Sequence, residues 1–187
     1  MKHQFDEMRA TQAAARIFRL AGRPRLNYMV LIKFLYLVDR EALLRWGRLV
    51  TYDDHFEMKL GPILSNIHDL ITDPSAAEGR HFWRQFIVTD KYDVELLGDP
   101  GNDDLSEAEE ELIDEVFRKY QHLKDDPFEF ADALHRTLPE LTGIQEGRAP
   151  LEITQILAAA KIPAGVISAI EDDLDAAGAV EIFLPRP

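Results

Sequence analysis

The chain has 187 residues, which is enough for one hydrophobic core with a small appended unit. Its 46% hydrophobic and 29% charged residues are typical of a soluble globular protein. The absence of cysteine excludes disulfides, thiol catalysis and zinc sites with cysteine ligands. The longest apolar run, Tyr28–Ile32, is too short to cross a bilayer, and no N-terminal signal pattern is visible, so we expect a cytoplasmic protein without a membrane partner.

The charge is distributed unevenly along the chain. Residues 1–50 hold 10 Lys and Arg against 4 Asp and Glu, a balance of +6, whereas residues 51–187 hold 11 against 30, a balance of −19. The net charge of −13 argues against a dedicated nucleic-acid binder, whose affinity comes largely from phosphate neutralisation. The two regions could pair within one fold or present two faces of opposite sign, and internal pairing is the commoner arrangement.

Two helices are expected in the first quarter. Apolar residues recur at helical spacing from Met8 to Leu20, and Gly22 and Pro24 follow as stop signals. The second helix runs from Leu26 to Trp46 and should end at Gly47. Between Tyr28 and Val38 its sole polar residue is Lys33, so this helix should lie in the middle of the core.

The stretch from His55 to Ile71 changes character at Gly61-Pro62. His55–Leu60 alternates polar and apolar residues, which indicates a short extended segment. Pro62 lacks an N–H and has a fixed φ, which suits the first position of a helix. We therefore expect a helix that begins at Pro62 and has Ile63, Ile67, Leu70 and Ile71 on one face.

The middle of the chain predicts a β-hairpin and two further helices. Trp83–Val88 is rich in aromatic and β-branched residues, Tyr92–Leu96 alternates, and a turn at Thr89–Lys91 would join them. A helix is predicted over Leu105–Leu123, and Ser106 and Glu109 would form a capping box at its N-terminus. A shorter helix should follow Asp126, with Pro127 at its first position, before a linker over Thr142–Pro150.

The last part of the chain predicts two short helices, Leu151–Ala160 and Pro163–Ala177, and a final strand, Ala179–Leu184. The expected fold class is α+β and mainly α-helical: a helical bundle around a central buried helix, with a small antiparallel sheet formed by the hairpin and the C-terminal strand. We expect one domain over residues 1–187, with residues 150–187 as a C-terminal helix–helix–strand subunit.

No pattern in the sequence makes a case for catalysis. The six histidines do not form a zinc spacing, and phosphate-binding and nucleophile-elbow motifs are absent. A lysine on an otherwise apolar helix is unusual, because a buried ammonium needs a partner or a route to water. Lys33 could bind a ligand, but a paired or snorkelling core lysine is the commoner case.

One block of the chain resembles a known family. The residues concerned are Leu31, Lys33, Leu35, Tyr36, Asp39, Arg40, Gly47, Arg48, Lys59, Gly61, Pro62, Ser65 and Ile67. Together they resemble the Panacea domain of SocA-like antitoxins, and weaker likenesses at Leu105–Tyr120 and Leu151–Ala160 extend the similarity over most of the chain.

The resemblance implies an antitoxin that neutralises a cognate toxin by direct protein binding, of a kind often encoded in bacterial prophage DNA. One branch of the family delivers its toxin to a ClpXP-type protease, so such a protease is a second implied partner. The family implies no enzyme activity, cofactor or metal. It nominates seven residues as candidates for partner binding: Lys33, Tyr36, Asp39, Arg40, Lys59, Gly61 and Pro62.

Two alternatives remain open from the sequence. The C-terminal helix pair resembles a helix-turn-helix, which would suit a DNA-associated or prophage regulatory protein. Its second helix, however, carries Glu171, Asp172, Asp173 and Asp175 and no Lys or Arg, which makes direct DNA reading improbable. The other alternative is an enzyme with an unrecognised site built from His55, Glu57 and His68. The sequence does not predict the oligomeric state.

Overall fold

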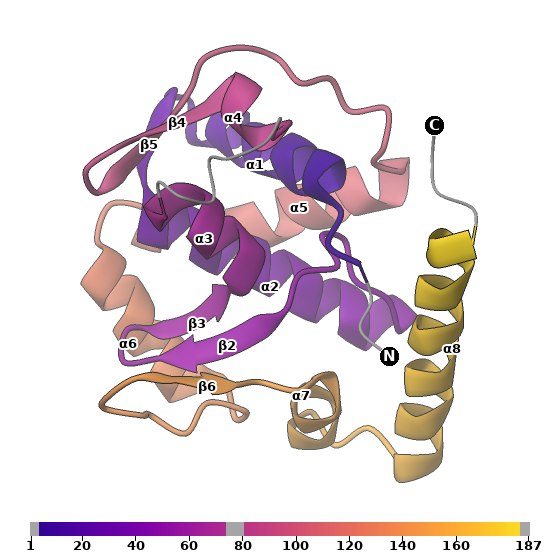
Figure 1. The fold of residues 1–187 in the computed structure, drawn as a ribbon. Coiled ribbons are helices and arrows are strands. Elements are labelled where there is room, and N and C mark those ends of the chain that lie inside the picture. The colour runs from indigo at the N-terminus through magenta and orange to yellow at the C-terminus, as the bar shows by residue number, and fades with distance from the viewer. Residues whose placement is uncertain (1–3, 74–80, 184–187) are drawn as a thin grey trace.

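The computed structural model describes residues 4–73 and 81–183 (Figure 1). Within these ranges the chain is mainly helical and carries two small antiparallel sheets. This confirms the expected α+β class. No helix in the described ranges is both long enough and apolar enough to cross a bilayer.

The two N-terminal helices form as the sequence predicts. Helix α1 (Glu7–Ala21) begins at Asp6, whose side chain accepts a hydrogen bond from the Arg9 amide, and ends at the left-handed Gly22. Helix α2 (Tyr28–Trp46) ends in the same way at Gly47. Every residue from Val30 to Arg40 is buried, so α2 is the central helix of the core.

Further helices surround α2 (Figure 1). Helix α5 (Glu107–Tyr120) begins with the expected capping box of Ser106 and Glu109, and continues into a short 3-10 helix (Gln121–Leu123). Helix α6 (Pro127–Thr137) begins at Asp126, with proline in its first turn. Phe34 of α2 lies between α5 and α6, with its ring centroid 5.1 Å from those of Phe117 and Phe130.

The predicted hairpin is present, with a shorter first strand. Trp83–Phe86 forms a helical turn, α4, and the hairpin comprises β4 (Ile87–Asp90) and β5 (Asp93–Leu96). Its third partner is β1 (Arg25–Asn27), which pairs with β5 in the order β1-β5-β4. The sequence pattern does not predict β1; it predicts the third strand of this sheet at the C-terminus instead.

The prediction that Pro62 begins a helix is wrong. Residues Gly61–Leu64 form strand β3, which pairs antiparallel with β2 (His55–Met58), and Glu57 lies opposite Pro62. Pro62 is tolerated because β3 is an edge strand of a sheet ordered β3-β2-β6, where β6 spans Arg148–Pro150. Gly61 is the first residue after the tight turn of this hairpin, and its φ of +92° is readily adopted by glycine. Helix α3 (Ser65–Thr72) begins three residues after Pro62.

The C-terminal strand is also a wrong prediction. After α7 (Ile153–Ala159), helix α8 runs from Ala164 to Phe183 and includes most of the expected strand, whose last residue lies outside the described ranges. Figure 1 shows α8, in yellow, along one side of the molecule. Its contact with the end of α2 is close: a Cβ added to Gly47 would lie 3.0 Å from Cγ1 of Ile170.

Candidate functional site

Asp39, a candidate for partner binding, is fully buried and holds the loop after α2. Its carboxylate accepts hydrogen bonds from the amides of Val50 and Thr51, both at 2.8 Å, and from the Thr51 hydroxyl. The Nε2 atom of His55 lies 3.6 Å from the same carboxylate. Asp39 therefore fixes the path of the chain from α2 into β2.

Tyr36 and Arg40 converge on a residue that the sequence analysis missed. Glu140, in the turn after α6, accepts hydrogen bonds from the Tyr36 hydroxyl at 3.0 Å and from Arg40 Nε and Nη2 at 2.5 and 3.1 Å. Burial would lower the pKa of Arg40, but the hydrogen bond and charge of Glu140 outweigh it and raise that pKa. Asp39 and Arg40 are adjacent in sequence, but they make two separate buried contacts.

Three of the other four candidates, Lys33, Lys59 and Gly61, line one cavity. The turn of the β2–β3 hairpin, which carries Lys59 and Gly61, lies over Lys33 of α2, and the cavity has a volume of about 280 Å³. Lys59 is exposed at its rim, whereas Lys33 is 1% exposed. A Cβ on Gly61 would lie 3.7 Å from the Lys33 ammonium, so the glycine brings the hairpin close to it. Pro62 is buried next to this turn but does not line the cavity.

Among the described residues, none supplies a counter-charge to the Lys33 ammonium. Burial lowers the pKa of Lys33 from 10.5 to about 8, and no other group shifts it. Within the described part of the chain, no hydrogen bond or ion pair engages this ammonium. Of the three sequence interpretations, the core lysine paired with an acid does not match this environment, whereas a ligand-binding lysine and a snorkelling lysine are both compatible with it.

The residues of the alternative enzyme site are used in three separate places. Glu57 binds the loop after α6, where its carboxylate accepts hydrogen bonds from the Thr142 and Gly143 amides at 3.0 and 2.6 Å. Burial would raise the pKa of Glu57, but these hydrogen bonds lower it overall. His55 faces Asp39, and His68 of α3 lines the Lys33 cavity. No cluster of three potential metal ligands occurs among the described residues.

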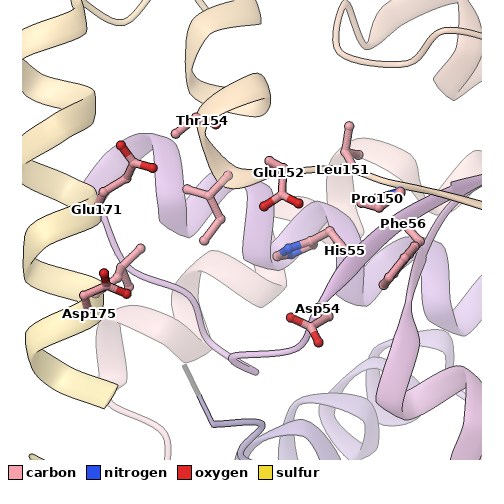
Figure 2. A pocket seen from close by; sticks show the side chains of 11 residues that line it. Asp54, His55, Phe56, Pro150, Leu151, Glu152, Thr154, Glu171 and Asp175 are labelled. Carbon is pink, nitrogen blue, oxygen red and sulfur yellow. The ribbon is translucent and has the colours of Figure 1, made fainter. Parts of the chain in front are cut away.

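A second cavity, of about 440 Å³, opens between α8 and the sheet β3-β2-β6. Its walls carry four carboxylates: Asp54, Glu152, Glu171 and Asp175. Figure 2 shows Glu171 and Asp175 on α8, across the opening from Glu152 and His55. Apart from the half-buried Asp54, these acidic side chains are exposed. We call this cavity, with these four residues, the acidic cleft.

The uneven charge of the sequence is largely resolved by internal pairing. Arg16 of α1 contacts Glu110 and Asp114 of α5 at 2.7 Å each, and Arg9 contacts Glu109 at 2.5 Å. Several other N-terminal arginines have acidic partners too: Arg19, Arg23, Arg25, Arg45 and Arg48. The basic first quarter is thus largely neutralised within the fold.

Comparison with known proteins identifies the family. The family model described as antitoxin SocA-like, Panacea domain, matches residues 31–138. This span begins within α2, includes both hairpins and α5, and ends before α7 and α8. No curated protein and no solved structure gives a significant match to the chain. Because the matched residues make up more than half of the sequence, the chain belongs to the SocA-like antitoxin family with a Panacea domain.

Proposed function

We propose that this protein is the antitoxin of a toxin–antitoxin pair and that it neutralises its cognate toxin by direct protein binding. The observation that carries the proposal is the family match over residues 31–138. The buried contacts of Tyr36, Asp39 and Arg40 fit a supporting role, in which these residues stiffen a scaffold. The contact with the toxin then falls to exposed side chains around that scaffold.

The acidic cleft is the toxin-binding surface in this proposal. The chain carries a net charge of −13, and most arginines of its first quarter already have acidic partners. An acidic surface attracts a basic partner over long range and selects against acidic ones. We therefore infer that the toxin presents a Lys- or Arg-bearing segment to Glu171 and Asp175 on α8.

Growth rescue tests the proposal. The product of the adjacent gene, expressed alone, should arrest growth, and co-expression of this chain should restore it. The double substitution Glu171→Lys and Asp175→Lys should weaken the rescue and lower the affinity for the toxin by at least about tenfold, because two attractions become repulsions. The proposal would be contradicted if the product of the adjacent gene is harmless, or if it stays toxic when this chain is co-expressed.

A matched control lies on the same helix. Asp172 and Asp173 of α8 are exposed but do not line the cleft. Changing both to lysine alters the net charge by the same amount as the test variant. This control should retain rescue if the cleft is the contact. Equal loss in both variants would instead indicate that net charge alone governs the association.

The fate of the toxin separates simple blocking from proteolytic delivery. If the chain acts as an adaptor for a ClpXP-type protease, the amount of toxin should fall on co-expression and recover in cells without that protease. If binding alone neutralises the toxin, its amount should stay constant and the two proteins should co-purify. Both outcomes retain the antitoxin function, and they differ in its mechanism.

The DNA-associated alternative gains no support from the residues of α8. Glu171, Asp172, Asp173 and Asp175 are all exposed there, and such carboxylates would repel phosphate groups. We expect no retention of a promoter fragment by this chain at physiological salt. Retention that depends on α8 would favour the regulator instead.

A further inference from the structure

The cavity at Lys33 has features of a ligand site. Its walls come from the N-terminal half of α2, the β2–β3 turn, α3 and the loop at residues 145–147. The lining is mostly apolar and includes Met29, Ile32, Met58, Ile63 and the exposed Leu60. Concave apolar sites with a few converging polar groups are the usual form of small-ligand sites.

The Lys33 ammonium is the polar group inside this cavity. Lys33 is 1% exposed and lines the cavity, and no described acidic group pairs with it. A buried ammonium without a partner costs free energy, which an anion in hydrogen-bond contact would recover. Gly61 keeps the hairpin turn free of a side chain beside this ammonium.

The remaining titratable groups of the cavity restrict the charge of the ligand. They are Lys59, His68, Tyr28 and Glu146. Lys59 and Glu146 are both exposed, so their opposite charges are screened by water and largely offset each other. The buried charge that a ligand would meet is therefore the single cation of Lys33, which suits one carboxylate.

From this geometry we propose that the cavity binds a carboxylate attached to an apolar group, with the carboxylate on the Lys33 ammonium and the apolar group against Met29, Ile32 and Met58. A volume of about 280 Å³ accommodates a group of the size of a short acyl chain or a leucine side chain. Such a carboxylate can come from a free acid or from the C-terminal residue of a polypeptide. The toxin contact proposed above lies on other residues, so neither proposal depends on the other.

Titration of the purified chain with defined probes tests the inference. Hexanoate represents a free acid, and N-acetyl-leucine represents a C-terminal residue; hexanamide and N-acetyl-leucinamide are their neutral counterparts. We expect at least one carboxylate to bind with a dissociation constant below about 10 mM. Its amide should bind at least about tenfold more weakly, because the amide cannot neutralise the ammonium. Binding of hexanoate, of N-acetyl-leucine or of both identifies the source and supports the inference.

Two substitutions locate the interaction. Lys33→Met keeps the length and apolar character of the side chain and removes its charge, and it should weaken carboxylate binding at least about tenfold. Lys59→Met removes the exposed cation at the rim and should change the affinity by less than about threefold. Circular dichroism and urea unfolding check that both variants fold.

Three results would overturn the inference. The first is that neither carboxylate binds below about 10 mM. The second is equal binding of acid and amide. The third is that a folded Lys33→Met variant binds the carboxylate as well as the unmodified chain does. All these titrations omit the toxin, so their failure would leave the antitoxin proposal untouched.

Discussion

Lys33 destabilises the unliganded fold at neutral pH. Its pKa is about 8 in the folded chain against 10.5 for an exposed lysine, so between these values the unfolded chain binds more protons than the folded one. The free energy of unfolding should therefore rise with pH across this window, as the folded chain loses the proton that burial disfavours. Below pH 8 the full penalty applies, and it amounts to about 3 kcal/mol.

Replacing Lys33 with methionine should remove this penalty. At pH 7 the variant should be more stable than the unmodified chain by up to about 3 kcal/mol, and the difference should shrink as the pH rises from 8 towards 10.5. Urea unfolding at several pH values measures both quantities. A difference that stays constant across this range would mean that the ammonium is not the cause.

The buried contact of Arg40 with Glu140 should be costly to break. Arg40 is 8% exposed, and Glu140→Ala would remove its closest acidic partner and leave it only the 3.6 Å contact with Glu41. This substitution should lower the free energy of unfolding by about 3–5 kcal/mol. The matched control is Glu115→Ala, which removes the partner of the exposed Arg45 and should cost less than about 1 kcal/mol. Similar losses in the two variants, measured by urea unfolding, would contradict a buried origin of the effect.

At the scale of elements, the junction between α2 and α8 depends on Gly47. Gly47 has φ +67°, and an added Cβ would lie 3.0 Å from Ile170 of α8. Gly22 has the same φ at the end of α1, but an added Cβ would have no neighbour within 4 Å. Both alanine substitutions carry the cost of a left-handed alanine, about 1–2 kcal/mol, whereas Gly47→Ala alone should also disturb the packing of α8.

We therefore expect Gly47→Ala to lower the free energy of unfolding by about 1 kcal/mol more than Gly22→Ala. The additional Ile170→Ala substitution should remove this excess, because it deletes the side chain that the new methyl group meets. Thermal unfolding of Gly47→Ala and Gly22→Ala, each with and without Ile170→Ala, checks the prediction. An excess that persists without the Ile170 side chain would place its origin elsewhere.

Elements with local signals were predictable, and elements that depend on distant partners were not. The capping box of α5 and the apolar face of α2 are encoded within the elements themselves, and both are confirmed. Gly61-Pro62 is compatible with a helix start or with an edge strand, and the pairing of β3 with β2 decides between them. Gly178 lies within α8, since one glycine costs a helix only about 1 kcal/mol.

The same distinction applies to the candidate site. Lys33 was identifiable because a single charge interrupts an apolar helix. Glu140 carried no local signal, because its partners Tyr36 and Arg40 lie 104 and 100 residues away in sequence. The acidic cleft brings together residues of β2, α8 and their neighbouring segments, and the tertiary fold alone places these carboxylates around one opening.

At the scale of the whole molecule, the fold combines an internally neutralised scaffold with an acidic surplus. Contacts between the arginines of α1 and the carboxylates of α5 join the first and middle parts of the chain. The remaining negative charge favours association with a basic protein and weakens with salt. The affinity for the toxin should therefore fall as the salt concentration rises, and the association rate should show most of this loss.

Purification of this chain together with the toxic product of the neighbouring gene tests the central claim most directly. A tag on the toxin alone should recover this protein in a fixed stoichiometry at physiological salt, and the Glu171→Lys, Asp175→Lys variant should be lost from the complex while the Asp172→Lys, Asp173→Lys control is retained. Direct binding would be contradicted if this chain neutralises the toxin in cells but the unmodified chain is not recovered with it.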